Sequence, residues 1–150
     1  MNKVYRQKPL APDEYLGHVR ADGKVYESRL GADKYIGRVE LESGKIFEAR
    51  LGPDKHIGHV DVESGKVYLE HFGPDEYLGR VRKDGKLYHH KFLASDEYMG
   101  KVTDMLSLAH GGAAFLLLVR PAFDEQAERV EEESEQDLND AEAGHATSPA

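Results

Sequence analysis

Apolar and polar residues alternate in short runs along the first hundred residues, and turn-forming residues separate the runs. In the stretch YIGRVEL, Tyr35, Gly37 and Val39 fall on one face of an extended chain, whereas Ile36 and Arg38 fall on the other. A period of two residues over runs this short predicts β-strands. On this alternation the apolar residue before the glycine lies on the charged face, so both faces of the predicted sheet carry apolar surface.

The runs are copies of one another. A nine-residue motif of the form GPDEYLGRV occurs five times, and the glycine near its end recurs every 20 or 21 residues. A second motif, of the form GKVY, follows each of the first four copies, and KVY alone precedes the first. Each unit therefore predicts a strand, a tight turn, a second strand and a further turn. The longer motif spans residues 11–19, 31–39, 52–60, 73–81 and 94–102.

The predicted turns have suitable residues. The Asp-Gly pairs at 22–23 and 84–85 fit two-residue hairpin loops, because glycine adopts positive φ without steric cost. The loops that end at Gly44 and Gly65 are one residue longer and fit a turn closed by a glycine bulge. The Gly-Pro-Asp sequences between units are also typical of turns.

The phase of the repeat bears on the overall shape. The chain begins with the second half of a unit, KVY, and its last recognisable copy is a first half that ends at Val102. If these two halves pair, five hairpin units of about 21 residues close into a pseudo-five-fold ring or barrel of about ten strands, without open edges. We therefore predict an all-β fold of this kind. An open, elongated array is the alternative, but it normally has distinct capping ends, and the N-terminal sequence shows none.

The pattern stops after Val102. The segment MLSLAHGGAAFLLLV, residues 105–119, is the most apolar in the chain and has to be covered. It predicts either a helix that plugs or caps the ring, or a helical turn broken at Gly111 and Gly112 and followed by a buried strand through Val119. The segment is short for a membrane span. We accordingly divide the chain into a β-hairpin repeat domain (1–104), an apolar plug or cap (105–119) and an acidic tail (120–150).

Charge distinguishes the tail from the body. Of 28 acidic residues, ten lie in 124–150 beside one Arg, which leaves 18 acids against 19 bases in 1–123, although the whole chain carries −8. A segment this acidic and this poor in apolar residues predicts disorder. The chain has no Cys, which excludes disulfides and cysteine chemistry, and the N-terminus has no apolar signal core. We expect a cytoplasmic protein.

The combination LGRVxxDGKLY, repeated with hairpin turns and followed by HGGAAFLLLV, resembles the small bacterial repeat proteins called β-flower proteins. The resemblance covers residues 3–119 and implies short hairpins around a pseudo-rotational axis, here in a five-fold version. It implies no activity and no catalytic residues. The Gly-Pro-Asp linkers and the acidic tail depart from simpler members. MORN repeats share the DGxxY element, but their Trp-rich strands are absent.

Two sets of repeated side chains are candidates for ligand binding. In a symmetric ring, the residues after the repeated glycine would form a basic ring that attracts anions, and the aromatic residues of the returning strands could stack on glycans. The alternatives are ordinary polar surface and cross-strand packing. The basic set is His18, Arg38, His59, Arg80 and Lys101. The aromatic set is Tyr5, Tyr26, Phe47, Tyr68 and Tyr88.

Other chemistry has less support in the sequence. The aspartates at the third position of the longer motif are explained by local turn hydrogen bonds better than by Ca²⁺ binding. No spacing of His residues resembles a zinc site. There is no catalytic motif, and a near-neutral body beside an acidic tail disfavours nucleic acid. We therefore expect no enzyme, cofactor or metal. The prediction is a structural or protein-interaction module that binds itself or another protein, with an anion- or glycan-binding module as the alternative.

Overall fold

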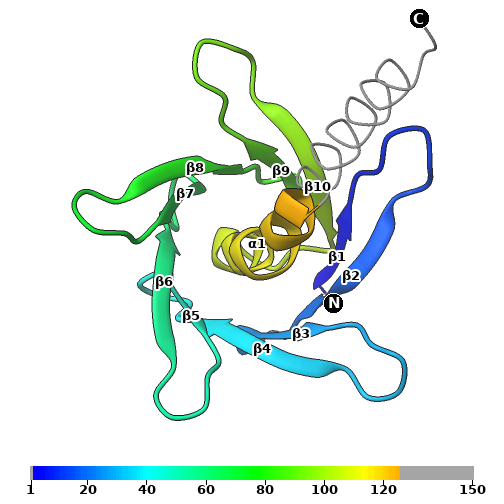
Figure 1. Ribbon diagram of the computed structural model, residues 1–150, viewed down its shortest axis with the longest axis vertical. Helices are drawn as coiled ribbons and strands as arrows, with labels where there is room; N and C mark the ends of the chain where they lie inside the picture. The colour runs from blue at the N-terminus through cyan, green and yellow to red at the C-terminus, as the bar shows by residue number, and fades with distance from the viewer. Residues whose placement is uncertain (1, 126–150) are drawn as a thin grey trace, which may run out of the picture.

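In the computed structural model, ten antiparallel strands form a closed barrel around a helical segment (Figure 1). The structure describes residues 2–125, so most of the predicted acidic tail lies outside the described residues. The strands are β1 (Asn2–Arg6), β2 (Glu14–Val19), β3 (Lys24–Glu27), β4 (Lys34–Val39), β5 (Lys45–Glu48), β6 (Lys55–Val60), β7 (Lys66–Leu69), β8 (Glu76–Val81), β9 (Lys86–His89) and β10 (Glu97–Thr103). The helical segment consists of α1 (Leu108–Ala114) and a π-helical turn, η1 (Phe115–Val119).

The barrel closes between β1 and β10, as the phase of the repeat predicts. These two strands are antiparallel neighbours, with Val4 opposite Val102 and Tyr5 opposite Lys101. Next to this junction, the side chain of Asn2 in β1 links β2 to the segment after β10, because its Nδ2 donates to the Val19 carbonyl at 2.9 Å and its Oδ1 accepts from the Leu106 amide at 2.8 Å. The prediction of a closed barrel without open edges is therefore confirmed.

A β-bulge near the repeated glycine changes the phase of five strands. In β4, for example, Gly37 lies opposite Val25 and Tyr35 lies opposite Tyr26, so Ile36 is the extra residue of the bulge. The residue before the glycine is skipped in the same way in β2, β6, β8 and β10. Its side chain packs on the core, so the placement of these apolar residues on the charged face was wrong. They are Leu16, Ile36, Ile57, Leu78 and Met99.

The interior of the barrel has a layer of branched side chains around the helix. Each strand contributes one fully buried residue to this layer, and α1 with η1 fills the space between them (Figure 1). A barrel of this size has a lumen that has to be filled, and residues 109–119 of the helix are all buried. The layer consists of Val4, Val19, Val25, Val39, Ile46, Val60, Val67, Val81, Leu87 and Val102.

The glycine pair does not break the helix. Gly111 and Gly112 both lie inside α1, so the first alternative for residues 105–119, a helix, is the one that the structure shows. A Cβ on Gly112 would lie 2.4 Å from Cβ of Val60, and one on Gly111 would lie 2.4 Å from Cγ1 of Val81. The glycines are therefore needed for close approach between the helix and the barrel wall.

The two ends of the barrel differ. Because all neighbouring strands are antiparallel, the five longer connections, which follow β1, β3, β5, β7 and β9, lie at one end, which we call the loop end. The short turns lie at the other end, the turn end. The helix starts at the turn end, where His110 Nε2 lies 3.0 Å from the Ala21 carbonyl. It emerges at the loop end, where Arg6 donates to the Ala122 carbonyl at 2.9 Å. Residues 120–125, which we assigned to the tail, continue the helix.

Candidate functional site

The five residues of the predicted basic ring lie on the outer face of the barrel, and each one contacts an aspartate of the following unit. The last unit pairs with the first, so the contacts form a closed circle. All five aspartates occupy the third position of the longer motif. The pairs are His18 with Asp33 (3.5 Å), Arg38 with Asp54 (3.1 Å), His59 with Asp75 (3.4 Å), Arg80 with Asp96 (3.8 Å) and Lys101 with Asp13 (3.6 Å).

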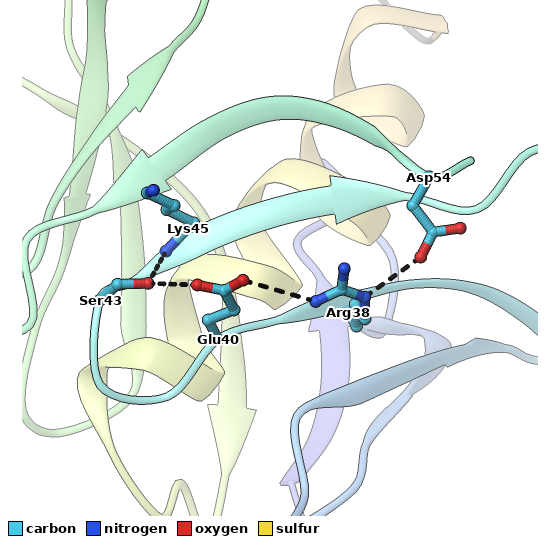
Figure 2. A network of polar contacts seen from close by, with 5 residues as sticks. All are labelled: Arg38, Glu40, Ser43, Lys45 and Asp54. Carbon is cyan, nitrogen blue, oxygen red and sulfur yellow. Dashed lines mark hydrogen bonds and ion pairs between the residues drawn. The ribbon is translucent and has the colours of Figure 1, made fainter.

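Figure 2 shows the pair made by Arg38 and the polar network next to it. The guanidinium Nε donates to Asp54 at 3.1 Å, and Nη1 lies 3.8 Å from Glu40. Ser43 donates to Glu40 at 2.8 Å and accepts from the Lys45 amide at 3.3 Å, which connects the ion pair to the short turn. Each side chain is about a third exposed, so such pairs contribute at most about 1 kcal/mol.

The basic residues also stack on the aromatic residues of the returning strands. The guanidinium of Arg38 lies 4.2 Å from the ring centre of Phe47, and the ring of His59 is stacked on Tyr68 at 4.8 Å. The remaining three make equivalent contacts: His18 with Tyr26 (5.3 Å), Arg80 with Tyr88 (5.9 Å) and Lys101 with Tyr5 (5.7 Å). A carboxylate, a basic group and an aromatic ring are therefore in contact at five equivalent places around the barrel.

A second aromatic ring extends each of these columns. It comes from the longer motif and packs against the first ring at 5.3–5.7 Å in a tilted arrangement, which is favourable for aromatic pairs. The five second rings are Tyr15, Tyr35, His56, Tyr77 and Tyr98. Burial raises the pKa of the four phenols, and the negative charge of a nearby aspartate raises it further.

These four tyrosines should titrate above the ordinary tyrosine pKa of about 10. A raised pKa in the folded state means that the neutral phenol is favoured there. The associated stability is therefore present below about pH 10 and is lost as the pH rises through the folded-state pKa. Absorbance titration near 295 nm, compared with the protein in urea, measures the shift. Tyr35→Phe should remove part of the late-titrating signal, and a native curve that coincides with the unfolded one would contradict the prediction.

This geometry does not favour ligand binding by either predicted ring. An anion at the basic ring would have to displace an aspartate at every position, and each basic group already lies against an aromatic face. The aromatic faces are likewise occupied by the basic groups and by the second rings. Both sets therefore make contacts that connect neighbouring units of the barrel.

The tips of the five long connections at the loop end are different, because each tip exposes a large apolar side chain. Leu10, Leu30, Leu51 and Phe72 are fully exposed, and the fifth tip exposes Phe92 and Leu93 at 86% and 91%. Figure 1 shows the five connections spread around the barrel, away from its core. We call this set the loop tips. Their repetition was present in the sequence, but their exposure could not be read from it.

Two of the loop tips also have unfavourable backbone conformations. Leu10 and Leu93 both have a φ of 56°, in the left-handed region that bulky residues rarely adopt. In three other connections a glycine occupies positive φ directly after the exposed residue: Gly31, Gly52 and Gly73. A leucine in this conformation costs about 1 kcal/mol or more. Its exposed side chain gains nothing in folding to offset that cost, which points to a role outside the fold.

A groove at the loop end separates the helix from part of the barrel rim. It has a volume of about 400 Å³ and is lined by apolar residues of β4, β6, β7 and η1 together with the charged residues Glu27, Lys34, Glu48 and Arg120. Its floor includes Leu116 and Leu117 of the π-helical turn, a type of turn often found at functional sites. The apolar lining consists of Ile36, Ala49, Ile57, Leu69, Leu116 and Leu117.

Residues 2–125 contain no group of three or more His, Asp or Glu side chains placed to hold a metal ion. His110 is buried, with Nδ1 2.7 Å from Ser107 Oγ and Nε2 facing the Ala21 carbonyl, so both of its nitrogens have structural partners. Among the same residues, none of the helices is sufficiently long and apolar to cross a membrane.

Comparison with known proteins returned no match among family models, curated proteins or solved structures.

Proposed function

We propose that the protein is a non-enzymatic interaction module: a pseudo-five-fold ring of β-hairpins that holds five loop tips around one end of a rigid barrel. The exposure of a large apolar side chain at every tip carries the proposal. Isolated exposed apolar residues are common on protein surfaces, but a set repeated at equivalent loops of one end is not. The β-flower resemblance agrees with such an arrangement of hairpins, and the ten-strand closed barrel supplies a rigid support.

The proposal is tested by removing the apolar tips together. The tip variant combines Leu10→Ser, Leu30→Ser, Leu51→Ser, Phe72→Ser, Phe92→Ser and Leu93→Ser. The control variant combines Leu41→Ser and Val62→Ser, which changes two partly exposed apolar residues of the turn end. Both should unfold at nearly the wild-type temperature.

The wild type, the tip variant and the control variant would be compared in three measurements. These are light scattering after size exclusion, capture of cellular proteins and adsorption to surfaces. We expect at least one association of the wild type and the control to be lost in the tip variant. If the tip variant equals the wild type in all three measurements, the loop tips are not the contact points and the proposal fails.

A further inference from the structure

The loop tips lie at one end of the barrel and are separate from one another. Their common location follows from the antiparallel topology, because every connection from an odd to an even strand lies at the loop end. Each tip offers one or two apolar side chains. A specific protein partner needs a contiguous patch of roughly 800 Å² on each side. A lipid surface, in contrast, can accept several separated points at once, because lipids rearrange around each of them.

Four of the five tips carry a Lys or Arg close to the apolar residue. Arg29 precedes Leu30, and Lys91 precedes Phe92. Lys8 and Arg50 take this place in two more tips, and the remaining tip has His71 instead. The long connections also carry six carboxylates, so their net charge is not positive: Asp13, Asp33, Asp54, Glu70, Asp75 and Asp96. An apolar side chain next to a basic one matches the boundary of a bilayer, where the acyl region lies just below the phosphates.

The acidic partners of these basic groups lie behind the tips. Arg29 contacts Glu27 at 3.3 Å, and Arg50 contacts Glu48 at 3.2 Å; both glutamates are the last residues of their strands. The Arg29 and Arg50 side chains are about half exposed. Exposed pairs of this kind are weak, so a lipid phosphate can replace the glutamate.

From these observations we infer that the loop end docks on a phospholipid bilayer, with the five apolar tips inserted below the phosphates. The inference rests on the proposed function and specifies its partner. Five weak insertions on one rigid support act together, because the first contact brings the others to the surface. The whole chain carries −8, so its overall charge repels an anionic bilayer, and binding would report the tips.

Flotation of the full chain with lipid vesicles provides the first test. We expect binding to phosphatidylcholine vesicles, and binding no stronger when the vesicles contain about 30% phosphatidylserine, because the long connections carry at least as many carboxylates as Lys and Arg side chains. The tip variant should lose at least about tenfold in partition coefficient, because the apolar contact is removed while the tip charges are kept. The control variant Leu41→Ser with Val62→Ser should bind like the wild type, because its changes lie at the turn end.

A single reporter then locates the contact. The chain contains no Trp, so Phe72→Trp places one indole at a loop tip and Leu41→Trp places one at the turn end. With the phosphatidylcholine vesicles, the emission of Phe72→Trp should shift to shorter wavelength and be quenched by lipids that carry a shallow nitroxide. The emission of Leu41→Trp should not change.

Three outcomes would overturn the inference: a wild type that does not bind the vesicles, a tip variant that binds as well as the wild type, or an emission shift in Leu41→Trp only. If the wild type does not bind the vesicles but the tip substitutions convert an oligomer to a monomer, the partner of the loop tips is a second copy of the chain. The lipid inference then fails, and the proposed interaction function stands.

Discussion

Phe115→Ala should lower the free energy of unfolding by about 3–5 kcal/mol, a large part of the stability of a domain this small. Phe115 is fully buried in η1, at the centre of the barrel, and a Cβ on Gly79 would lie 3.0 Å from its ring. Its removal leaves a cavity between the helix and strands that are hydrogen-bonded on both sides, so the wall cannot collapse to fill it. Urea unfolding followed by circular dichroism measures the change.

The matched control is Phe92→Ala at a loop tip. Phe92 is 86% exposed, so its loss should change the free energy of unfolding by less than about 0.5 kcal/mol. Similar losses in the two variants would contradict a helix seated inside the barrel, because that arrangement buries Phe115 and leaves Phe92 exposed.

Gly112→Ala should destabilise the protein by about 1–3 kcal/mol, although alanine is the better helix former by about 1 kcal/mol. The added Cβ would lie 2.4 Å from Cβ of Val60 and 2.5 and 2.8 Å from its two methyl groups. The helix or the wall would therefore have to move. Thermal or urea unfolding gives the sign of the effect, which propensity and packing predict oppositely.

Val60→Gly provides the compensating change for this prediction. It removes the Cβ and the two methyl groups that the new Cβ would meet, so the double variant should be more stable than the sum of the single effects predicts by about 1 kcal/mol or more. A stabilising Gly112→Ala, or additive effects, would mean that the helix does not approach the wall at this point.

Closure could be predicted because it depends on local signals that repeat. Turn residues such as Gly23 and Gly85 indicate hairpins one at a time, and a chain that starts with KVY and finishes its pattern at Val102 leaves two half-units that can pair. The side assigned to Ile36 was wrong for a physical reason. A bulge inserts one residue into a strand, and a single insertion reverses the face of every side chain beyond it.

The sequence left the structure of residues 105–119 undecided, because helix propensity and packing give opposite indications at the glycine pair. Glycine has a low helix propensity in water. At position 112, however, a Cβ would collide with Val60 of the barrel wall, and this wall exists only in the folded protein. The ion pairs were missed although their spacing was visible. From Arg38 to Asp54 is 16 residues, and three of the other pairs are 15 or 16 residues apart. Lys101 and Asp13, which pair across the closure of the barrel, are 88 residues apart. Only the register of the hairpins brings them together.

The exposure of the loop tips depends on how far a connection projects from the barrel, which the order of residues does not reveal. Leu51 and Val39 are both apolar residues in the same repeat, yet one is fully exposed and the other is buried. An apolar residue just before a Gly-Pro or Gly-Ala turn, repeated without a strand to place it in, was the available signal.

The closing junction affects how the molecule is made. A ribosome delivers β1 first, whereas its neighbour β10 and the helix that fills the lumen come about a hundred residues later. Until then, a growing chain has an unpaired edge and an apolar concave surface in contact with water, both of which promote aggregation. The nascent hairpins therefore gain little from forming early, and native structure should appear in one late, cooperative step that a holdase chaperone would favour.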